Sequence, residues 1–292
     1  MAVSLNPGGD PEAAQAAAAD QQELEQLEVD LLLEAVYRRY GFDFRQYAQA
    51  SLKRRLYRRM AVERVTSLTQ LQDRLLHEPA SMEGLLLDLS INVTSMFRDP
   101  TFYAAFREKV VPALHTYPFT RIWCAGCSTG EEVYSLAILL TEEGLYDRTR
   151  IYATDINENV LLGAREGVFP LERMKQYTQN YLRGGGKRDF SEYYVAAYDG
   201  ARFSRSLLEN VVFAQHNLAM DSTFNQFNAI LCRNVMIYFD RELQERVHGL
   251  FCDSLERFGI LALGHKESIA FTGFAARYEP IDAEERIYRK VS

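Results

Sequence analysis

The sequence predicts an α/β protein: a doubly wound, mainly parallel sheet, preceded by a helical domain and carrying a small β insertion. Three observations predict it. From Thr120 onward, short apolar runs alternate with amphipathic segments of helical length, which is typical of parallel strands joined by helical crossovers. Before that point, apolar residues recur at helical spacing. The charge also changes sign, because residues 31–78 hold ten Lys or Arg against five acids, whereas the chain after them carries more acids than bases.

Length and composition bound what the chain can be. Its 292 residues are 47% hydrophobic and 25% charged, which allows one large or two modest domains and excludes disorder over the whole length. No run approaches the roughly 18 apolar residues of a membrane-spanning helix, and the start lacks the layout of a secretion signal, so we expect a cytoplasmic protein without direct membrane insertion. Four cysteines are too few for a disulfide scaffold, and a net charge of -7 argues against a general nucleic-acid binder.

The first third of the chain divides into an acidic lead-in and a basic helical domain. Residues 1–30 hold seven acids and no Lys or Arg, and are expected to be flexible or loosely helical. Residues 31–98 are expected to form the helical domain. Its first helix stops at Gly41, and further helices are predicted at about 44–60, 67–76 and 82–89.

Four arginines mark the second of these helices. Their spacing places them along one helix face, with Leu52 and Leu56 on another: Arg54, Arg55, Arg58 and Arg59. A solvated cationic face is the simpler interpretation of this pattern. The alternative is a docking face for an acidic partner.

Residues 99–292 are expected to form the α/β domain. Strands are predicted at 121–125, 151–154, 227–232 and 260–263, and helices at 131–140 and 241–258. The last stretch, 276–291, alternates around Pro280 and is typical of an antiparallel hairpin at the sheet edge. Between about 184 and 213, a Gly-Gly-Gly turn and two short strand-like runs interrupt the rhythm and predict a small β subdomain, with an ornamental loop as the alternative.

Open α/β sheets bind ligands at the carboxyl ends of their strands. The first predicted strand meets a loop of small residues from Gly126 to Gly130, and the second ends in Asp155, whose carboxylate can accept hydrogen bonds from both ribose hydroxyls. The dinucleotide spacing G-x-G-x-x-G is absent, which favours a nucleoside without phosphates. The adjacent acids Glu131 and Glu132 would repel phosphate but could bind an ammonium group. S-adenosylmethionine has that ammonium and no phosphate.

Five motifs follow one another along the chain. They are Asn92-Val-Thr94-Ser-Met-Phe-Arg98-Asp99, Cys124-Ala-Gly-Cys-Ser-Thr-Gly-Glu-Glu-Val-Tyr-Ser135, Ala153-Thr-Asp155-Ile156, His216-Asn217-Leu218 and Cys232-Arg-Asn-Val-Met-Ile-Tyr-Phe239. Together they resemble the CheR family, the chemotaxis receptor methyltransferases, over about residues 31–292. The resemblance implies a class I S-adenosylmethionine-dependent methyltransferase domain with an N-terminal helical domain and a small β subdomain. It also implies methyl transfer to glutamate side chains on the cytoplasmic helices of chemoreceptors.

The resemblance further implies roles for particular residues. Asn92, Thr94 and Arg98 would line the cofactor and the edge of the active site. The other cofactor contacts would be Glu131 at the methionine end, Asp155 at the ribose, Asn217 and Leu218 near the adenine, and Arg233 and Asn234 closing the pocket. Tyr238 would sit near the reacting methyl. Whether Glu131 or Glu132 contacts the cofactor stays open, and S-adenosylhomocysteine, the product, is expected to bind as well.

The implied reaction needs no general base, because a glutamate side chain with a reference pKa near 4.3 is already ionised at neutral pH. A carboxylate oxygen would attack the sulfonium methyl in line, and the enzyme would align and partly desolvate it. Arg98 is expected to orient the carboxylate by a forked contact, and Tyr238 to position donor or acceptor through its hydroxyl. Cys124 and Cys127 form a C-x-x-C without a second ligand pair, so small-residue packing is favoured over a metal site or a redox dithiol.

Two other functions stay open at this point. The chain could bind S-adenosylmethionine only to sense or scaffold, or it could methylate nucleic acid and hold phosphates with the basic helix. Intact Arg98, Asp155 and Tyr238 count against the first, and the absence of an Asn-Pro-Pro-Tyr type signature counts against the second. The β subdomain could also hold a receptor's C-terminal peptide by strand addition. Its candidate contacts are Tyr193, Tyr194, Arg202, Phe203 and Arg205.

Overall fold

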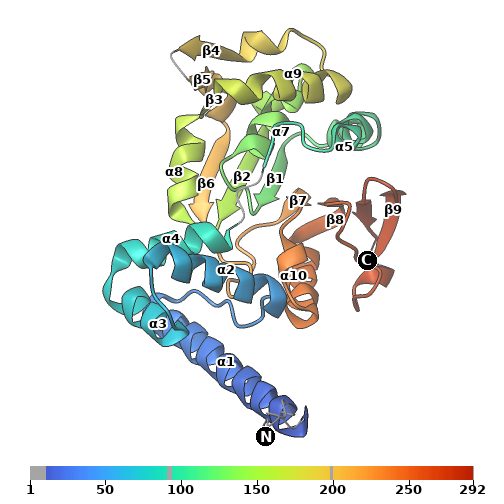
Figure 1. The fold of residues 1–292 in the computed structure, drawn as a ribbon. Helices are drawn as coiled ribbons and strands as arrows, with labels where there is room; N and C mark the ends of the chain where they lie inside the picture. Colours follow the sequence, from blue (N-terminus) through green and yellow to red (C-terminus); the bar gives the residue numbers. More distant parts are fainter. Residues whose placement is uncertain (1–10, 91–93, 198–199, 292) are drawn as a thin grey trace, which may run out of the picture. The chain divides into compact units, whose positions relative to one another are not determined.

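The computed structural model describes residues 11–90, 94–197 and 200–291 of the chain, which divides into two compact units, Met1–Asp88 and Leu89–Ser292 (Figure 1). The division lies earlier than the boundary after residue 98 that the sequence suggested. Among the described residues, no helix is both long enough and apolar enough to cross a bilayer.

Four helices make up the described part of the first unit. α1 runs unbroken from Pro11 to Tyr40, so the expected lead-in and the expected first helix are one continuous helix over the described residues. It stops where the sequence predicts, because Gly41 follows in the left-handed conformation (φ +77°) that glycine adopts without strain. The other three helices match the predicted segments and are α2 (Gln49–Glu63), α3 (Leu68–His77) and α4 (Pro79–Leu89).

The second unit is built on a seven-stranded sheet in the order β6-β2-β1-β7-β8-β10-β9. The first five strands are parallel to one another, and β10 is antiparallel to both β8 and β9, which confirms the predicted fold class. From β1 the chain adds β2 and β6 on one side, and it then returns to add β7 and β8 on the other side. The strand order therefore reverses between β1 and β7, and a ligand is expected outside the carboxyl ends of these two strands. The strands are β1 (Thr120–Ala125), β2 (Thr149–Asp155), β6 (Val211–Gln215), β7 (Phe227–Cys232), β8 (Leu255–Leu263), β9 (Tyr278–Asp282) and β10 (Ile287–Lys290).

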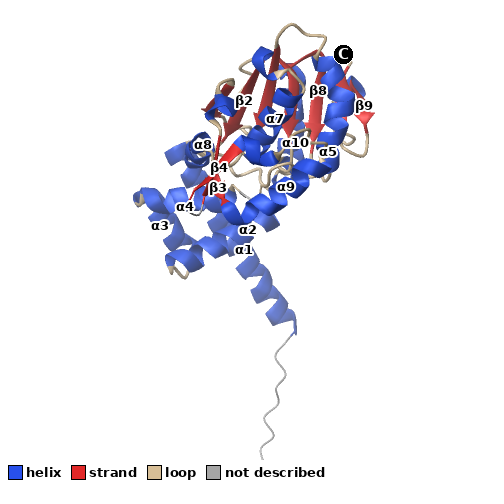
Figure 2. Ribbon diagram, turned by 90° about the horizontal axis from the view of Figure 1, so that it is seen from above, coloured by secondary structure: helices blue, strands red, loops and turns tan. Residues whose placement is uncertain are grey.

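Helices cover both faces of this sheet (Figure 2). Successive side chains of a strand point to opposite faces. Ile122 and Cys124 of β1 belong to the core cluster that contains Leu136 of α7, whereas the ring of Trp123 between them lies 5.5 Å, centroid to centroid, from that of Phe251 on α10. The helices are α5 (Pro100–Ala105), a π-helix (Phe106–Val110), α6 (Val111–Leu114), α7 (Glu131–Glu142), α8 (Glu158–Glu166) and α10 (Arg241–Ser254), with short 3-10 turns at Tyr146–Arg148 and Ala275–Arg277.

A second, three-stranded sheet in the order β3-β5-β4 forms the predicted β subdomain, but its limits differ from the expected 184–213. It begins earlier, with β3, a strand of three residues that is too short to show alternation in the sequence. Residues 211–213 open β6 of the main sheet instead, where they pair with β2. The elements are β3 (Val168–Pro170), α9 (Met174–Arg183), β4 (Tyr194–Ala197) and β5 (Gly200–Phe203), with 3-10 turns at Leu171–Arg173, Phe190–Tyr193 and Arg205–Leu208.

The end of the chain forms the predicted hairpin, β9 and β10, at the edge of the main sheet. Pro280 lies in β9, the outermost strand, where the missing N–H of proline costs no internal ladder bond. One helix end was predicted wrongly: α10 stops at Ser254 rather than 258, and β8 begins at Leu255. Polar residues open β8 and Phe258 interrupts its pleat at φ +67°, so the sequence there resembles a helix end more than a strand.

Candidate cofactor and active site

The loop after β1 is bonded to the end of β2. Asp155 closes β2 and is 7% exposed; its Oδ2 accepts a hydrogen bond from the backbone N–H of Ser128 (2.9 Å) and its Oδ1 one from that of Asn157 (3.0 Å). Burial raises the pKa of the Asp155 carboxyl, and these backbone donors partly offset the rise. A carboxylate has about four acceptor sites. Asp155 can therefore fix this loop and still accept hydrogen bonds from a ligand.

Two glycines allow the loop to pack closely. Gly126 has φ +75°, and a Cβ there would lie 2.5 Å from Cγ2 of Val235 in the loop after β7. Gly130 has φ +94°, and a Cβ there would lie 2.9 Å from Cβ of Ala164 on α8. Both positions combine a left-handed backbone with a contact too short for a side chain. The glycines that the sequence pattern singled out are thus required by the backbone itself.

The adjacent acids at the start of α7 have different partners. Glu131 is 3% exposed, and its carboxylate accepts hydrogen bonds from the hydroxyls of Thr129 (2.6 Å) and Tyr177 (3.2 Å). Glu132 forms an ion pair with Arg233 (3.0 Å). Burial raises the pKa of Glu132, and the positive charge of Arg233 opposes that rise. Arg233 therefore compensates Glu132 from within the protein, whereas Glu131 has two neutral hydrogen-bond partners and a longer ion pair (3.9 Å) with the half-exposed Arg173.

Arg233 follows β7 and joins three segments. Its side chain is 1% exposed, and it bonds to Asp99 (2.8 Å), Glu132 (3.0 Å) and the backbone carbonyl of Arg98 (3.2 Å). Its guanidinium carbon lies 4.0 Å from the ring centroid of Phe102, within the range of a cation–π contact. The charge of Arg98 also acts on Glu132 and lowers its pKa. The buried Arg233 side chain thus connects the backbone carbonyl of Arg98 to Glu132 on α7.

Glu267, which the sequence reasoning missed, organises the same loop from the other side. It is 4% exposed, and its two oxygens accept hydrogen bonds from the backbone N–H groups of Asn234 (2.9 Å), Val235 (2.8 Å), Met236 (2.8 Å) and Gly264 (2.6 Å). The signal that could have found it is the one that found Asp155, an acid just beyond the carboxyl end of a predicted strand. Applied to the strand that ends at 263, the same rule leads to Glu267.

The loop after β6 borders Asp155 as well. The N–H of His216 donates to the Asp155 carbonyl (3.1 Å), and the N–H of Asn217 donates to Asp221 (2.7 Å). Leu218 is buried. His216 is 8% exposed, and its Nδ1 has no hydrogen-bond partner within the described part of the chain. The His216 ring itself packs against those of Trp123 (5.1 Å between centroids) and Phe224 (5.2 Å), so its backbone rather than its side chain joins this loop to Asp155.

The remaining predicted site residues have fewer contacts. The carbonyl of Thr94 accepts a hydrogen bond from Arg173 (3.3 Å), whose guanidinium lies 3.9 Å from Glu131. Tyr238 is half-buried and ends the short 3-10 helix η6 (Met236–Tyr238). Asn92 lies outside the described residues. The carboxyl ends of β1, β2, β6 and β7 thus bring most of the predicted residues to one edge of the sheet: Thr94, Arg98, Glu131, Asp155, Asn217, Leu218, Arg233, Asn234 and Tyr238.

The four arginines of α2 do not share one exposed face, and this part of the prediction is corrected. Arg54 and Arg58 are exposed, the latter with 73% of its side chain. Arg55 is only 5% exposed. Arg59 bonds to Asp88 of α4 (2.8 Å) and therefore serves the interior of the helical unit. A docking surface on α2 reduces to Arg54 and Arg58.

The aromatic residues expected to grip a peptide at the β subdomain also need correction. Tyr193 is 6% exposed and donates its hydroxyl to Glu142 (2.8 Å), and Phe203 is 3% exposed, so both belong to the core. The edge strand β4 nevertheless presents Val195, which is 72% exposed. The candidate contacts that remain accessible are Tyr194, Arg202 and Arg205.

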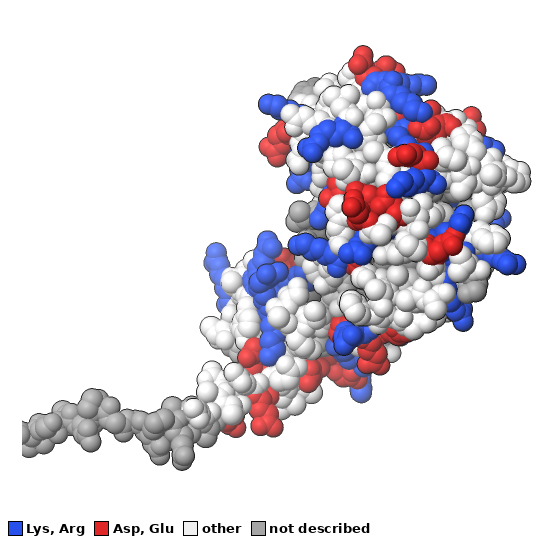
Figure 3. Space-filling model, turned by 90° about the vertical axis from the view of Figure 1, so that its right-hand side faces the viewer, with Lys and Arg blue, Asp and Glu red and all other residues white. Residues whose placement is uncertain are grey.

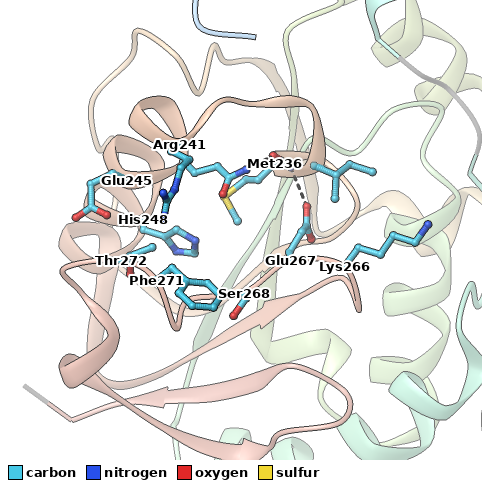
Figure 4. Close-up of a pocket in the computed structure, with 11 residues that line it drawn as sticks. Met236, Arg241, Glu245, His248, Lys266, Glu267, Ser268, Phe271 and Thr272 are labelled. Atoms are coloured by element: carbon cyan, nitrogen blue, oxygen red, sulfur yellow. Dashed lines mark hydrogen bonds between the residues drawn. The ribbon is translucent and has the colours of Figure 1, made fainter. Parts of the chain in front are cut away.

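A cavity of about 250 Å³ lies between η6, the first turns of α10 and the loop after β8 (Figure 4). We call this cavity the β7–β8 pocket; its lining includes Met236, Ile237, Arg241, His248, Lys266 and Phe271. Tyr238 directly follows Ile237, so the wall of the pocket and a predicted catalytic residue share one turn. No sequence signal predicted this pocket.

The C-x-x-C cysteines are buried, and neither forms a disulfide. Burial raises the pKa values of Cys124 and Cys127 well above the usual range of a thiol. A protonated thiol is a poor nucleophile and a poor metal ligand. The geometry therefore favours the packing role over the redox alternative.

Comparison with known proteins gives concordant matches to both parts of the chain. The family model described as "CheR methyltransferase, SAM binding domain" matches residues 92–286, and that described as "CheR methyltransferase, all-alpha domain" matches residues 27–90. The protein Cher3 of Pseudomonas putida is 49% identical over 264 residues, which are 90% of this chain and 97% of that protein. "Chemotaxis protein methyltransferase 2" of Pseudomonas aeruginosa is 33% identical, over 84% of this chain and 87% of that protein. "Chemotaxis protein methyltransferase" of Escherichia coli is 30% identical, over 80% and 82%.

Proposed function

Because the chain belongs to the CheR family of S-adenosylmethionine-dependent methyltransferases, we propose that it methylates glutamate side-chain carboxylates of chemoreceptors and thereby forms methyl esters. The observation that carries the proposal is the position of Asp155. It is a buried carboxylate at the carboxyl end of β2, bonded to the glycine loop after β1. That edge is where a doubly wound sheet holds a nucleoside.

The residues at this edge fit the cofactor, which supplies the methyl group when bound. Asp155 accepts a backbone hydrogen bond at each carboxylate oxygen and has acceptor capacity left for the ribose hydroxyls, and we assign Asn217 and Leu218 to the neighbourhood of the adenine. Glu131 is the better partner for the ammonium group, because the buried Arg233 pairs with Glu132 at 3.0 Å, whereas the half-exposed Arg173 lies 3.9 Å from Glu131. We assign Thr94, Arg98 and Asn234 to the same site, and Asn92 by its motif alone.

The chain's own residues would act on the acceptor carboxylate by orienting it and excluding water. No base is needed, since a glutamate is ionised at neutral pH. Arg98 is held at its backbone by Arg233, and we assign its guanidinium to a forked contact with the incoming carboxylate. Tyr238 ends a turn whose backbone is fixed by Glu267, and we assign its hydroxyl to positioning either reactant.

Chemoreceptors are the proposed partner because relatives of this chain are named chemotaxis methyltransferases. We assign a docking role to Arg54 and Arg58, which face solvent on α2. A receptor's C-terminal peptide is proposed to add to the edge strand β4, beside Val195. Titration with receptor tail peptides tests this contact, and no measurable binding would leave the methylation helices as the receptor's contact.

Methylation of nucleic acid is the rival activity, and the surface charge does not favour it. Figure 3 shows several basic side chains gathered over one part of the face and acidic and basic side chains interspersed over the rest. The whole chain carries a net charge of -7. Phosphate binding would give affinity that falls steeply with salt. A filter-binding series across salt concentrations therefore distinguishes the two substrates.

The direct test is transfer of labelled methyl from S-adenosylmethionine to cytoplasmic fragments of chemoreceptors. We expect base-labile label, because methyl esters hydrolyse in base, and we expect loss of the label when the acceptor glutamates are replaced by alanine. Arg98→Lys should lower kcat, since lysine is a point charge and lacks the fork. Full turnover of Arg98→Lys would contradict the forked contact, and base-stable label would contradict ester formation.

A further inference from the structure

The β7–β8 pocket is not used by the mechanism proposed above. It is formed by three segments of the second unit that meet at the carboxyl ends of β7 and β8 (Figure 4). In doubly wound sheets, this edge is where ligands approach. The pocket is therefore on the correct side of the sheet to contact the acceptor.

The two acids in its wall accept hydrogen bonds from backbone N–H groups. Glu267 accepts four backbone hydrogen bonds, and Glu245 accepts one from the N–H of Gly273 (3.0 Å). The side-chain amide of Gln244 donates to the carbonyls of Met236 (3.1 Å) and Phe239 (3.0 Å). These hydrogen bonds hold the three segments that line the pocket in place, so the pocket is formed in the absence of a ligand.

The other charged groups of the wall are cationic. Arg241 and Lys266 are exposed, and neither forms an ion pair with any other residue that the structure describes. His248 is 1% exposed, and its Nδ1 lacks a hydrogen-bond partner among those residues. Because burial lowers the pKa of His248 to about 4, its ring is neutral at pH 7. The pocket thus has two exposed cations, two wall acids of which Glu267 is buried, and one unused imidazole nitrogen.

The rim points to a protein ligand rather than a small anion. Phe271 is 84% exposed, which is unusual for a ring of that size. Together with Met236 and Ile237, it gives the pocket an apolar side next to its cations. Exposed aromatic rings beside arginine are typical of protein interfaces. A small anion would leave the Phe271 ring in water, whereas a protein segment would cover it.

We propose that the β7–β8 pocket is a docking subsite for an acidic side chain of the methyl-accepting protein, distinct from the glutamate that receives the methyl group. The inference rests on the proposed function. Ile237 lines the subsite and Tyr238 follows it, so an acid held there lies at a fixed offset from the reacting carboxylate. Residues three or four apart on a helix are neighbours. The subsite would therefore select which glutamate of a receptor helix is presented to Arg98 and Tyr238.

The test is steady-state methylation of receptor cytoplasmic fragments by charge-reversed variants. We expect Lys266→Glu combined with Arg241→Glu to raise KM for the fragment about tenfold, which corresponds to about 1.4 kcal/mol of binding. kcat and the affinity for S-adenosylmethionine should stay unchanged. The matched control is Arg257→Glu, an exposed cation at the amino end of β8, on the opposite edge of the sheet.

A reciprocal change on the substrate locates the partner acid. Each acid within two helical turns of the methylated glutamate is replaced by lysine, and one of these changes should raise KM for the unmodified enzyme and lower it for the double variant. An unchanged KM for the double variant overturns the subsite while leaving the proposed function intact. Weakened cofactor binding in that variant also overturns it, because the cations would then belong to the cofactor site. Failure of the unmodified enzyme to methylate any fragment contradicts the proposed function itself.

Discussion

The Glu267 carboxylate holds the backbone N–H of Asn234 at 2.9 Å, while Asn234 sits in the left-handed region at φ +62°. Asparagine tolerates the left-handed conformation better than most residues, but it adopts that conformation only where surrounding contacts stabilise it. The neighbouring N–H groups of Val235 and Met236 bond to the same carboxylate. One buried side chain thus shapes the turn that runs from Arg233 toward Tyr238.

Glu267→Gln is expected to lower the free energy of unfolding by about 1–3 kcal/mol, because the new amide group would face backbone N–H donors and leave them unsatisfied. Affinity for S-adenosylmethionine should fall as well, since Asn234 would no longer be held. Denaturant titration and calorimetry measure the two effects. Glu245→Gln is the control, because Glu245 bonds only the N–H of Gly273 and is half-exposed. Equal losses in the two variants would contradict the special role of Glu267.

The two buried acids show how far the sequence could predict the site. Asp155 was predictable because it ends an apolar strand next to a glycine loop, and both signals are local. Glu267 also follows a predicted strand, but its partner Asn234 lies 33 residues away, so the bonds that give Glu267 its role have no local signal. The fold class, the order of strands and helices and most of the predicted helices followed from periodicity in the same way.

The errors of prediction have a shared physical origin. The three-residue strand β3 is too short to show a period, and the α2 arginines are sorted into exposed and buried pairs by contacts such as that of Arg59 with Asp88. The core positions of Tyr193 and Phe203 likewise depend on tertiary packing. Periodicity gives the spacing of residues along an element, but the partner that covers one face comes from elsewhere in the chain.

Arg233 and Glu132 form a buried pair, so removing one partner should be costly. Arg233→Met is expected to destabilise the protein by about 3–5 kcal/mol, because it leaves Glu132 without its compensating charge. Adding Glu132→Gln should recover part of that loss. A double-mutant cycle by denaturant titration measures the coupling. Strictly additive effects would show that the two side chains do not stabilise each other.

Asp155→Ala is expected to weaken binding of S-adenosylmethionine and S-adenosylhomocysteine by roughly 1.5–3 kcal/mol, about 10-fold to 150-fold, if the carboxylate accepts hydrogen bonds from the ribose. Calorimetry measures the change. Asp155→Asn is the matched variant, because it keeps the size and one acceptor and should lose less. Unchanged affinity in Asp155→Ala would remove this residue from the cofactor site.

His248 should make stability depend on pH in a defined window. Its pKa is lowered by burial from 6.5 to about 4, so the unfolded chain binds a proton more readily than the folded one. The stability that the neutral ring allows is fully present above pH 6.5 and is lost as the pH falls toward 4, by up to about 3 kcal/mol. Denaturant titrations at a series of pH values give the free energy of unfolding, which should fall more steeply with decreasing pH in the unmodified protein than in His248→Gln. Parallel pH profiles would contradict the assignment.

Arg54 and Arg58 are the last pair to test, because they are the exposed arginines of α2. Arg54→Glu combined with Arg58→Glu should lower kcat/KM on a receptor fragment roughly tenfold at low salt, since exposed charges steer association, and the difference should shrink as salt screens them. Cofactor affinity should not change, whereas the unfolding midpoint should fall slightly, because Arg58 also pairs with Asp88 (3.7 Å). The control, Arg39→Glu with Arg64→Glu, reverses two other exposed arginines of the same unit. An equal loss in the control would show that net charge, rather than this face of α2, governs the encounter with the receptor.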